Sequence, residues 1–153
     1  MIYNREKAIA YAHKWAFDRN PEYFNFDALG GDCTNFISQC LFAGCGVMNY
    51  TRDTGWYYVS PANRAAAWSG VEFLYKFLTT NKGVGPRARE IPPDQCQPGD
   101  IIQLSFDGTT FGHSLFVVGA DPVITIATHT YDSDNRPLFT YEYDRARGLG
   151  VEG

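Results

Sequence analysis

The sequence predicts an α+β domain in which helices come first and an antiparallel sheet follows. Apolar residues recur with the 3.6-residue period of helices up to about residue 80. After residue 100 they recur with the two-residue period of strands. Strands and helices do not alternate along the chain, which argues against a parallel sheet. A chain of 153 residues can bury a core of its own, so we expect residues 1–153 to form a single domain.

Three helices are expected in the first half of the chain. The first covers about residues 5–17, with Asn4 as its N-cap. The second begins after Asp32, which is a residue type that suits an N-cap. The third follows Ser69, which forms a capping-box pattern with Glu72 three residues later. Each helix presents one apolar face, so all three are expected to pack on a common core.

Four strands are expected in the second half, and a connector rich in proline and glycine over residues 83–99 precedes them. The strands cover residues 101–106, 113–119, 123–130 and 139–143. If residues 120–122 form a three-residue turn, His113 lies directly opposite His129, with Cβ atoms about 5 Å apart. A turn one residue longer or shorter would remove this pairing, because the register would slip.

Composition excludes several classes of function. A net charge of −4 and an isoelectric point near 5.3 argue against a nucleic-acid partner, which needs a basic face. No apolar segment is long enough for membrane insertion. The first residues lack the basic head and apolar segment of a secretory signal. Three alternatives therefore remain: the protein acts in the cytoplasm, it is exported by another route, or the chain is a domain excised from a longer protein.

The cysteine pattern predicts free thiols and neither a metal nor a cofactor. The four cysteines are spaced unlike the ligand pairs of a zinc site, and a chain of this size does not need disulfides. Only three histidines occur in the chain. The acidic run that begins at Asp132 lacks the spacing and distal glutamate of a calcium-binding EF-hand loop.

Cys33 stands out because two glycines and an aspartate precede it and a helix is expected to begin there. The helix dipole favours a thiolate at this position. A cysteine hydrolase needs a nucleophile, a histidine that protonates the leaving amine, and a polar group that orients the histidine. The cysteine's own N–H could hold an oxyanion. A structural cysteine and core histidines are the ordinary alternative, and residue types alone leave both interpretations open.

The stretch GGDCTNFISQC, residues 30–40, resembles the nucleophile segment of the bacterial putative amidase domain family. That family belongs with the papain-like cell-wall cysteine hydrolases, which include the CHAP amidases. Further blocks that resemble the family follow in the right order at residues 5–26, 97–104, 111–119 and 127–138. The resemblance implies a papain-like α+β fold, with the nucleophile helix packed on a small antiparallel sheet or half-barrel.

The resemblance also implies roles for individual residues. It makes Cys33 the nucleophile and His113 the base and acid, and it places the orienting group on the next strand. His129 is the first choice for that group, and Asp132 is the alternative. Four side chains upstream of the cysteine are candidates for the oxyanion hole or for substrate contact: Asp32, Asp27, Asn25 and Tyr23. Independently of the resemblance, four aromatic residues in or near an irregular segment are candidates to line a substrate groove: Trp56, Tyr57, Tyr58 and Trp68.

The function implied by the resemblance is hydrolysis of amide bonds in peptidoglycan or its fragments, by a monomer that acts at the cell wall or outside the cell. One alternative is a papain-like amidase or peptidase that acts on a substrate other than the wall. The other is a cell-wall-binding module that keeps the fold without the chemistry. An amidase with another substrate would still have a reactive Cys33 thiol, whereas a binding module would not.

Overall fold

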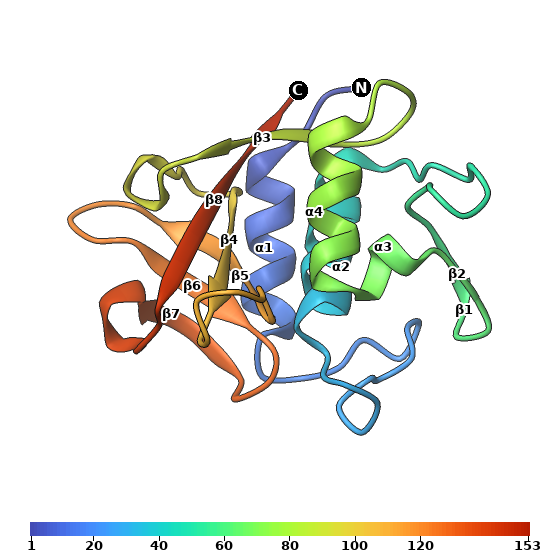
Figure 1. Cartoon of the computed structure of the whole chain (residues 1–153). Coiled ribbons are helices and arrows are strands. Elements are labelled where there is room, and N and C mark those ends of the chain that lie inside the picture. Colours follow the sequence, from blue (N-terminus) through green and yellow to red (C-terminus); the bar gives the residue numbers. More distant parts are fainter.

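The helices come from the first half of the chain and the main sheet from the second, as the periodicity predicts (Figure 1). The computed structural model describes all residues, 1–153. Its helices are α1 (Arg5–Trp15), α2 (Cys33–Cys45), α3 (Ala66–Ser69) and α4 (Val71–Thr80). Two short strands, β1 (Tyr58–Ser60) and β2 (Asn63–Arg64), form a hairpin of their own. None of these helices is long and apolar enough to cross a bilayer.

The ends of α1 and α2 follow from local chemistry. The side chain of Asn4 accepts a hydrogen bond from the N–H of Lys7, which satisfies one of the free donors at the start of α1. Helix α2 ends at Gly46, whose φ of 71° lies in the left-handed region that favours glycine. Both helices therefore begin and end close to the predicted positions.

The capping box predicted for α4 is wrong. Ser69 is the last residue of α3, and its hydroxyl accepts a hydrogen bond from Arg64 Nε at 2.9 Å. Gly70 stands at the N-cap of α4 instead and provides no side-chain hydrogen bond. The short helix α3 thus directly precedes α4, and only Gly70 separates the two.

The main sheet is antiparallel and has six strands in the order β3-β8-β4-β5-β6-β7. Their bounds are β3 (Arg87–Ile91), β4 (Ile101–Ser105), β5 (His113–Gly119), β6 (Thr125–Thr128), β7 (Ser133–Pro137) and β8 (Arg145–Glu152). Strand β8 returns at the end of the chain and lies between β3 and β4 (Figure 1). The α+β class is therefore confirmed.

One of the four predicted strands is wrong, and three strands of the sheet were not predicted. The proposed connector contains β3, and a 3-10 helix (Leu138–Thr140) occupies part of the strand expected at residues 139–143. Strands β7 and β8 were not expected. Strand β7 is an edge strand made of polar residues, and glycines interrupt the apolar pattern of β8, so neither shows the usual alternation.

The predicted pairing of β5 with β6 is also wrong. Gly119 pairs with Thr125 rather than with Val123, so the connection is longer than three residues, and the register shifts between Val117 and Gly119. Phe116 pairs with Ala127. Continued along the strands, this register brings Thr130, not His129, opposite His113. Because side chains alternate between the two faces, a slip of one residue turns His129 away from His113.

The core lies on both faces of the sheet. The larger cluster fills the space between the helices and the sheet, and its fully buried members include Phe36, Trp56, Trp68 and Phe116. The smaller cluster covers the opposite face and includes Leu115 of β5. Strand β5 thus alternates between two buried layers, which fixes the direction in which its first residue, His113, points.

Trp56 and Trp68 belong to the core and do not line a groove, contrary to the sequence-based expectation. Both side chains are fully buried. Trp56 Nε1 donates to Ser38 Oγ at 3.0 Å, and Trp68 Nε1 donates to Asn35 Oδ1 at 2.9 Å. The polar atoms of α2 that accept these bonds allow both indole rings to be buried. All four cysteines are free thiols, as expected, and Cys40 is in the core.

Candidate active site

Cys33 is the first residue of α2 and lies against the start of β5. Its side chain is buried, with 7% exposure. The sulfur lies 3.8 Å from Thr34 Oγ1, and that hydroxyl lies 3.0 Å from Ser114 Oγ. The backbone of Ser114 lies beside the sulfur and favours its ionised form, which lowers the pKa of the thiol. Cys33 is therefore held one residue away from His113.

His113 begins β5 and is also buried, with 8% exposure. Its ring lies near two aromatic rings, with centroid distances of 6.4 Å to Phe106 and 6.1 Å to Tyr141. Burial, aided by the positive charge of Arg136, lowers the pKa of His113 to about 4. The imidazole is therefore neutral at pH 7 and able to accept a proton.

The protonation of Cys33 differs from the expectation drawn from its place in the helix. Burial raises the pKa of the Cys33 thiol, and the hydrogen bonds from Ser114 and Thr34 offset this effect only in part. The free protein therefore holds a neutral thiol beside a neutral imidazole, and not a preformed thiolate. The thiol proton must therefore move to His113 during attack, and it does so against the difference in pKa between the two groups.

His129 lies on the helix side of the sheet, where both of its ring nitrogens already have partners. Nδ1 is 2.5 Å from Asp32 Oδ2, and Nε2 donates to the carbonyl of Trp15 at 2.8 Å. The ring stacks on Phe36 at a centroid distance of 4.1 Å. His129 has no nitrogen left with which to orient His113. The predicted orienting role is corrected here, and the cause is the one-residue register slip.

Asp32 binds His129 and the loop before α2. Its Oδ1 accepts hydrogen bonds from the N–H of Phe26 at 2.8 Å and from Asn35 Nδ2 at 2.9 Å. The carboxylate makes no capping bond to the helix backbone. Burial alone would raise the pKa of Asp32, but the bonds from His129, Phe26 and Asn35 outweigh burial and lower it. An ionised carboxylate cannot donate to an oxyanion, so Asp32 is a structural partner of α2.

The remaining candidates also have local partners. Arg19 binds Asp132 at 2.9 Å and Asp27 at 3.0 Å, which places Asp132 in a surface ion-pair group rather than at His113. Asn25 accepts a hydrogen bond from the N–H of Asp27 within an exposed turn. Tyr23 packs on Trp68 at a centroid distance of 5.9 Å. None of these contacts directs a side chain toward the sulfur.

The backbone at the start of α2 provides donors that the candidate side chains do not. In the first turn of α2, the N–H of Phe36 donates to the carbonyl of Asp32. The three preceding N–H groups, of Cys33, Thr34 and Asn35, have no backbone acceptor. The positive end of the helix dipole lies at the same place. A negatively charged oxygen beside the sulfur would find its hydrogen-bond donors here.

An open pocket of about 500 Å³ adjoins His113 and contains residues that sequence reasoning missed. Its lining residues are Phe106, Gly112, His113, Thr130, Tyr131, Arg136 and Tyr141. The guanidinium of Arg136 lies 3.6 Å from the centroid of the Tyr141 ring. Both residues follow the last histidine of the sequence, in a segment whose structure was predicted incorrectly. An arginine in a short polar segment carries no periodic signal that would have identified it.

Comparison with known proteins identifies one family. A family model described as "Putative amidase domain" matches residues 2–151. The uncharacterized protein YhbB of Bacillus subtilis (strain 168) is 34% identical over 145 residues, which make up 92% of this chain and 45% of that protein. The chain thus spans less than half the length of that relative. No solved structure matches the chain.

Proposed function

The chain belongs to the putative amidase domain family, and on this premise we propose that it is a cysteine amidase that acts on peptidoglycan or its fragments. Cys33 is the nucleophile of this proposal and His113 is its general base and acid. The observation that carries it is the chain of contacts from the Cys33 sulfur through the Thr34 hydroxyl to Ser114, the residue next to His113. The free thiol of Cys33 is thus placed next to the start of β5, where the His113 ring lines an open pocket.

The proposed reaction begins with proton transfer from the Cys33 thiol to the neutral His113 ring as the sulfur attacks the amide carbonyl carbon. The electron pair of the C=O bond moves to oxygen, and the backbone N–H of Cys33 donates to that oxygen. The imidazolium of His113 then protonates the leaving nitrogen, the C–N bond breaks, and a thioester to Cys33 remains.

Water completes the proposed cycle. His113 takes a proton from the water molecule while the oxygen attacks the thioester carbonyl. The C–S bond then breaks, the sulfur recovers its proton from His113, and a carboxylic acid leaves. Each proton that His113 accepts is returned within the cycle, so the proposed scheme balances with Cys33, His113 and water alone.

The choice of peptidoglycan as substrate rests on the resemblance of the sequence blocks to the papain-like cell-wall hydrolases. The same site would serve an amidase that acts on a peptide or acyl group from another source. A wall-binding module without chemistry is the third candidate. The three differ in what happens to purified peptidoglycan.

Digestion of purified peptidoglycan, followed by mass spectrometry of the soluble products, tests the proposal. The wild-type protein is expected to release fragments that each gain one water, with new amino groups, and Cys33→Ala is expected to release none. Cys45→Ala is the matched control, because this half-buried thiol lies at the other end of α2. Release that survives Cys33→Ala would contradict the proposal. Binding without release would favour the wall-binding module.

A further inference from the structure

Arg136 has an unusual position among the charged residues near the candidate active site. It lines the pocket that adjoins His113, and no acidic side chain lines that pocket. Three other arginines pair with carboxylates, namely Arg5, Arg19 and Arg147, whereas no carboxylate lies within 4.0 Å of Arg136. A cation in an open pocket without an internal counter-ion is available to a ligand.

The Arg136 side chain is nevertheless fixed in place. Its Nε donates to Thr140 Oγ1 at 2.7 Å, and its Nη2 donates to the carbonyl of Thr140 at 3.3 Å. The guanidinium plane is also supported by the ring of Tyr141. These bonds do not use the two N–H groups of Nη1. The side chain is thus held in one orientation while part of its hydrogen-bonding fork stays free.

The backbone that carries Arg136 has several uncommon conformations. Thr130, Tyr131 and Asn135 have φ values of 66°, 56° and 54°, in the left-handed region that residues other than glycine seldom adopt. Such conformations cluster at ligand-binding sites, where surrounding structure maintains them. Thr130 and Tyr131 lie in the connection from β6 to β7, and Asn135 lies within β7. Together they bring the exposed Tyr131 and the half-buried Arg136 to one pocket.

We propose that Arg136 binds a carboxylate of the substrate, so that the amides cleaved by this enzyme carry a free carboxylate near the scissile bond. This inference rests on the proposed function, because it takes the pocket beside His113 as the place where substrate binds. A carboxylate matches the planar guanidinium fork. A phosphate dianion would need more positive charge than the single arginine of this pocket provides.

The distances set the spacing between this carboxylate and the reacting bond. The Tyr141 centroid lies 3.6 Å from the Arg136 guanidinium and 6.1 Å from the His113 ring. Arg136 and His113 are therefore at most about 10 Å apart, the length of about three extended residues. A carboxylate that is separated from the scissile amide by a few bonds, or by one residue, would therefore reach Arg136.

Alkylation of Cys33 by matched acid and amide reagents tests the inference. The reagents are the N-bromoacetyl derivatives of glycine, β-alanine and 4-aminobutyric acid, each as the free acid and as the primary amide. For at least one length, the acid is expected to modify Cys33 about tenfold faster than its amide, because it gains charge-assisted hydrogen bonds to Arg136. Mass spectrometry locates the modified cysteine.

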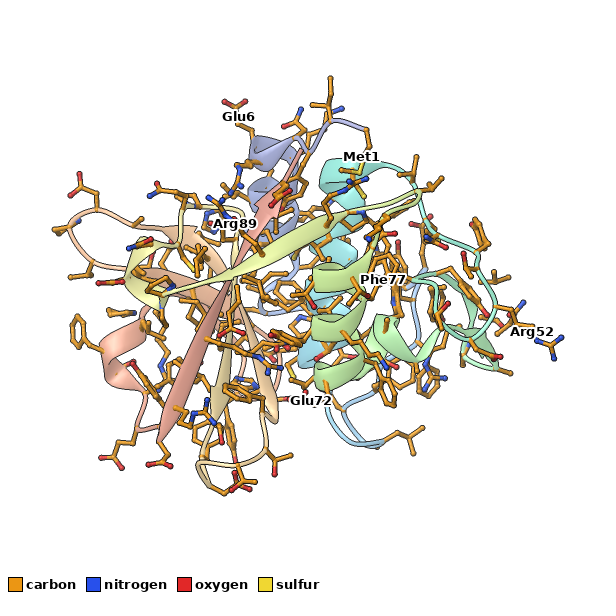
Figure 2. All side chains as sticks on the ribbon, turned by 45° about the horizontal axis from the view of Figure 1, so that its top comes forward. Met1, Glu6, Arg52, Glu72, Phe77 and Arg89 are labelled. Atoms are coloured by element: carbon orange, nitrogen blue, oxygen red, sulfur yellow. The ribbon has the colours of Figure 1, made fainter.

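Two variants make the test specific. Arg136→Gln is expected to bring acid and amide rates within about twofold of each other. Arg52→Gln, which changes the charge equally, is expected to keep the preference, because Arg52 lies on an exposed loop at the far end of the molecule (Figure 2). Equal rates for acid and amide in the wild type, or a preference that survives Arg136→Gln, would overturn the inference.

A second measurement separates this inference from the proposed function. If Cys33 reacts with none of the reagents, the proposed chemistry fails, and titration of N-acetylglycine decides the carboxylate site by itself. The acid is expected to shift the His113 ring resonances saturably in NMR spectra, while N-acetylglycinamide leaves them unchanged. The shift is expected to vanish in Arg136→Gln. Absence of a shift with the acid would refute carboxylate binding at Arg136.

Discussion

His113→Gln is expected to lower the rate of amide hydrolysis by about 10²- to 10⁴-fold, the usual contribution of a general acid–base group. Glutamine fills the same buried place but cannot take the Cys33 proton or protonate the leaving amine. The measurement is the initial rate at which amino groups appear from purified peptidoglycan. His13→Gln is the matched control, because His13 is exposed and bonds to Asp134 at the surface. An unchanged rate in His113→Gln would contradict the assigned role.

The pH dependence of the free energy of unfolding provides a second expected difference between the wild type and His113→Gln, and measuring it also shows that the variant is folded. The pKa of His113 is lowered to about 4, so the unfolded chain binds a proton at this residue near pH 6.5 and the folded chain does not. The native state is therefore fully favoured above pH 6.5, and it loses about 3 kcal/mol as the pH falls to 4. His113→Gln removes this loss, and urea unfolding at pH 7 and pH 4.5 would show a smaller difference than in the wild type.

Asp32→Asn is expected to lower the free energy of unfolding by about 3–5 kcal/mol, the usual loss when one partner of a buried ion pair is removed. Asp32 and His129 are each about 1% exposed and lie 2.5 Å apart. An asparagine would present an amide group where the carboxylate accepts bonds from His129, Phe26 and Asn35. Urea unfolding at pH 7 measures the effect.

Asp27→Asn provides the control for that substitution. Asp27 also binds Arg19, but its side chain is 44% exposed, so its loss is expected to cost less than about 1 kcal/mol. If both variants lost less than about 1 kcal/mol of unfolding free energy, the structural role given to Asp32 would be contradicted. That role is to connect the start of α2 to His129, which follows β6.

The helices could be predicted from sequence because their signals are local. Asn4 caps α1 and Gly46 ends α2, and in both cases the residue type has a direct conformational cause. The place of Cys33 at the start of α2 followed from the same signals. The resemblance of sequence blocks to the family added the chemical role that local signals cannot provide.

The sheet edges and the histidine pairing could not be predicted, because their causes are not local. The register of β5 and β6 depends on a bulge before Gly119, which no sequence pattern marks. That bulge decides that His129 meets Asp32 and not His113. Trp56 lies in an irregular segment, yet tertiary packing on α2 buries it. The protonation of Cys33 likewise depends on burial, which outweighs the helix dipole.

The coupling of Cys33 to His113 is tested most directly by the rate of iodoacetamide labelling between pH 3 and pH 9, measured separately for each cysteine in wild type and His113→Gln. At pH 7 the wild type is expected to label at Cys33 faster than at Cys45, because His113 accepts the thiol proton. That advantage should fall by half near pH 4, where His113 becomes protonated, and should be lost in His113→Gln. Labelling of Cys33 that is no faster than that of Cys45, or that does not depend on His113, would contradict the account.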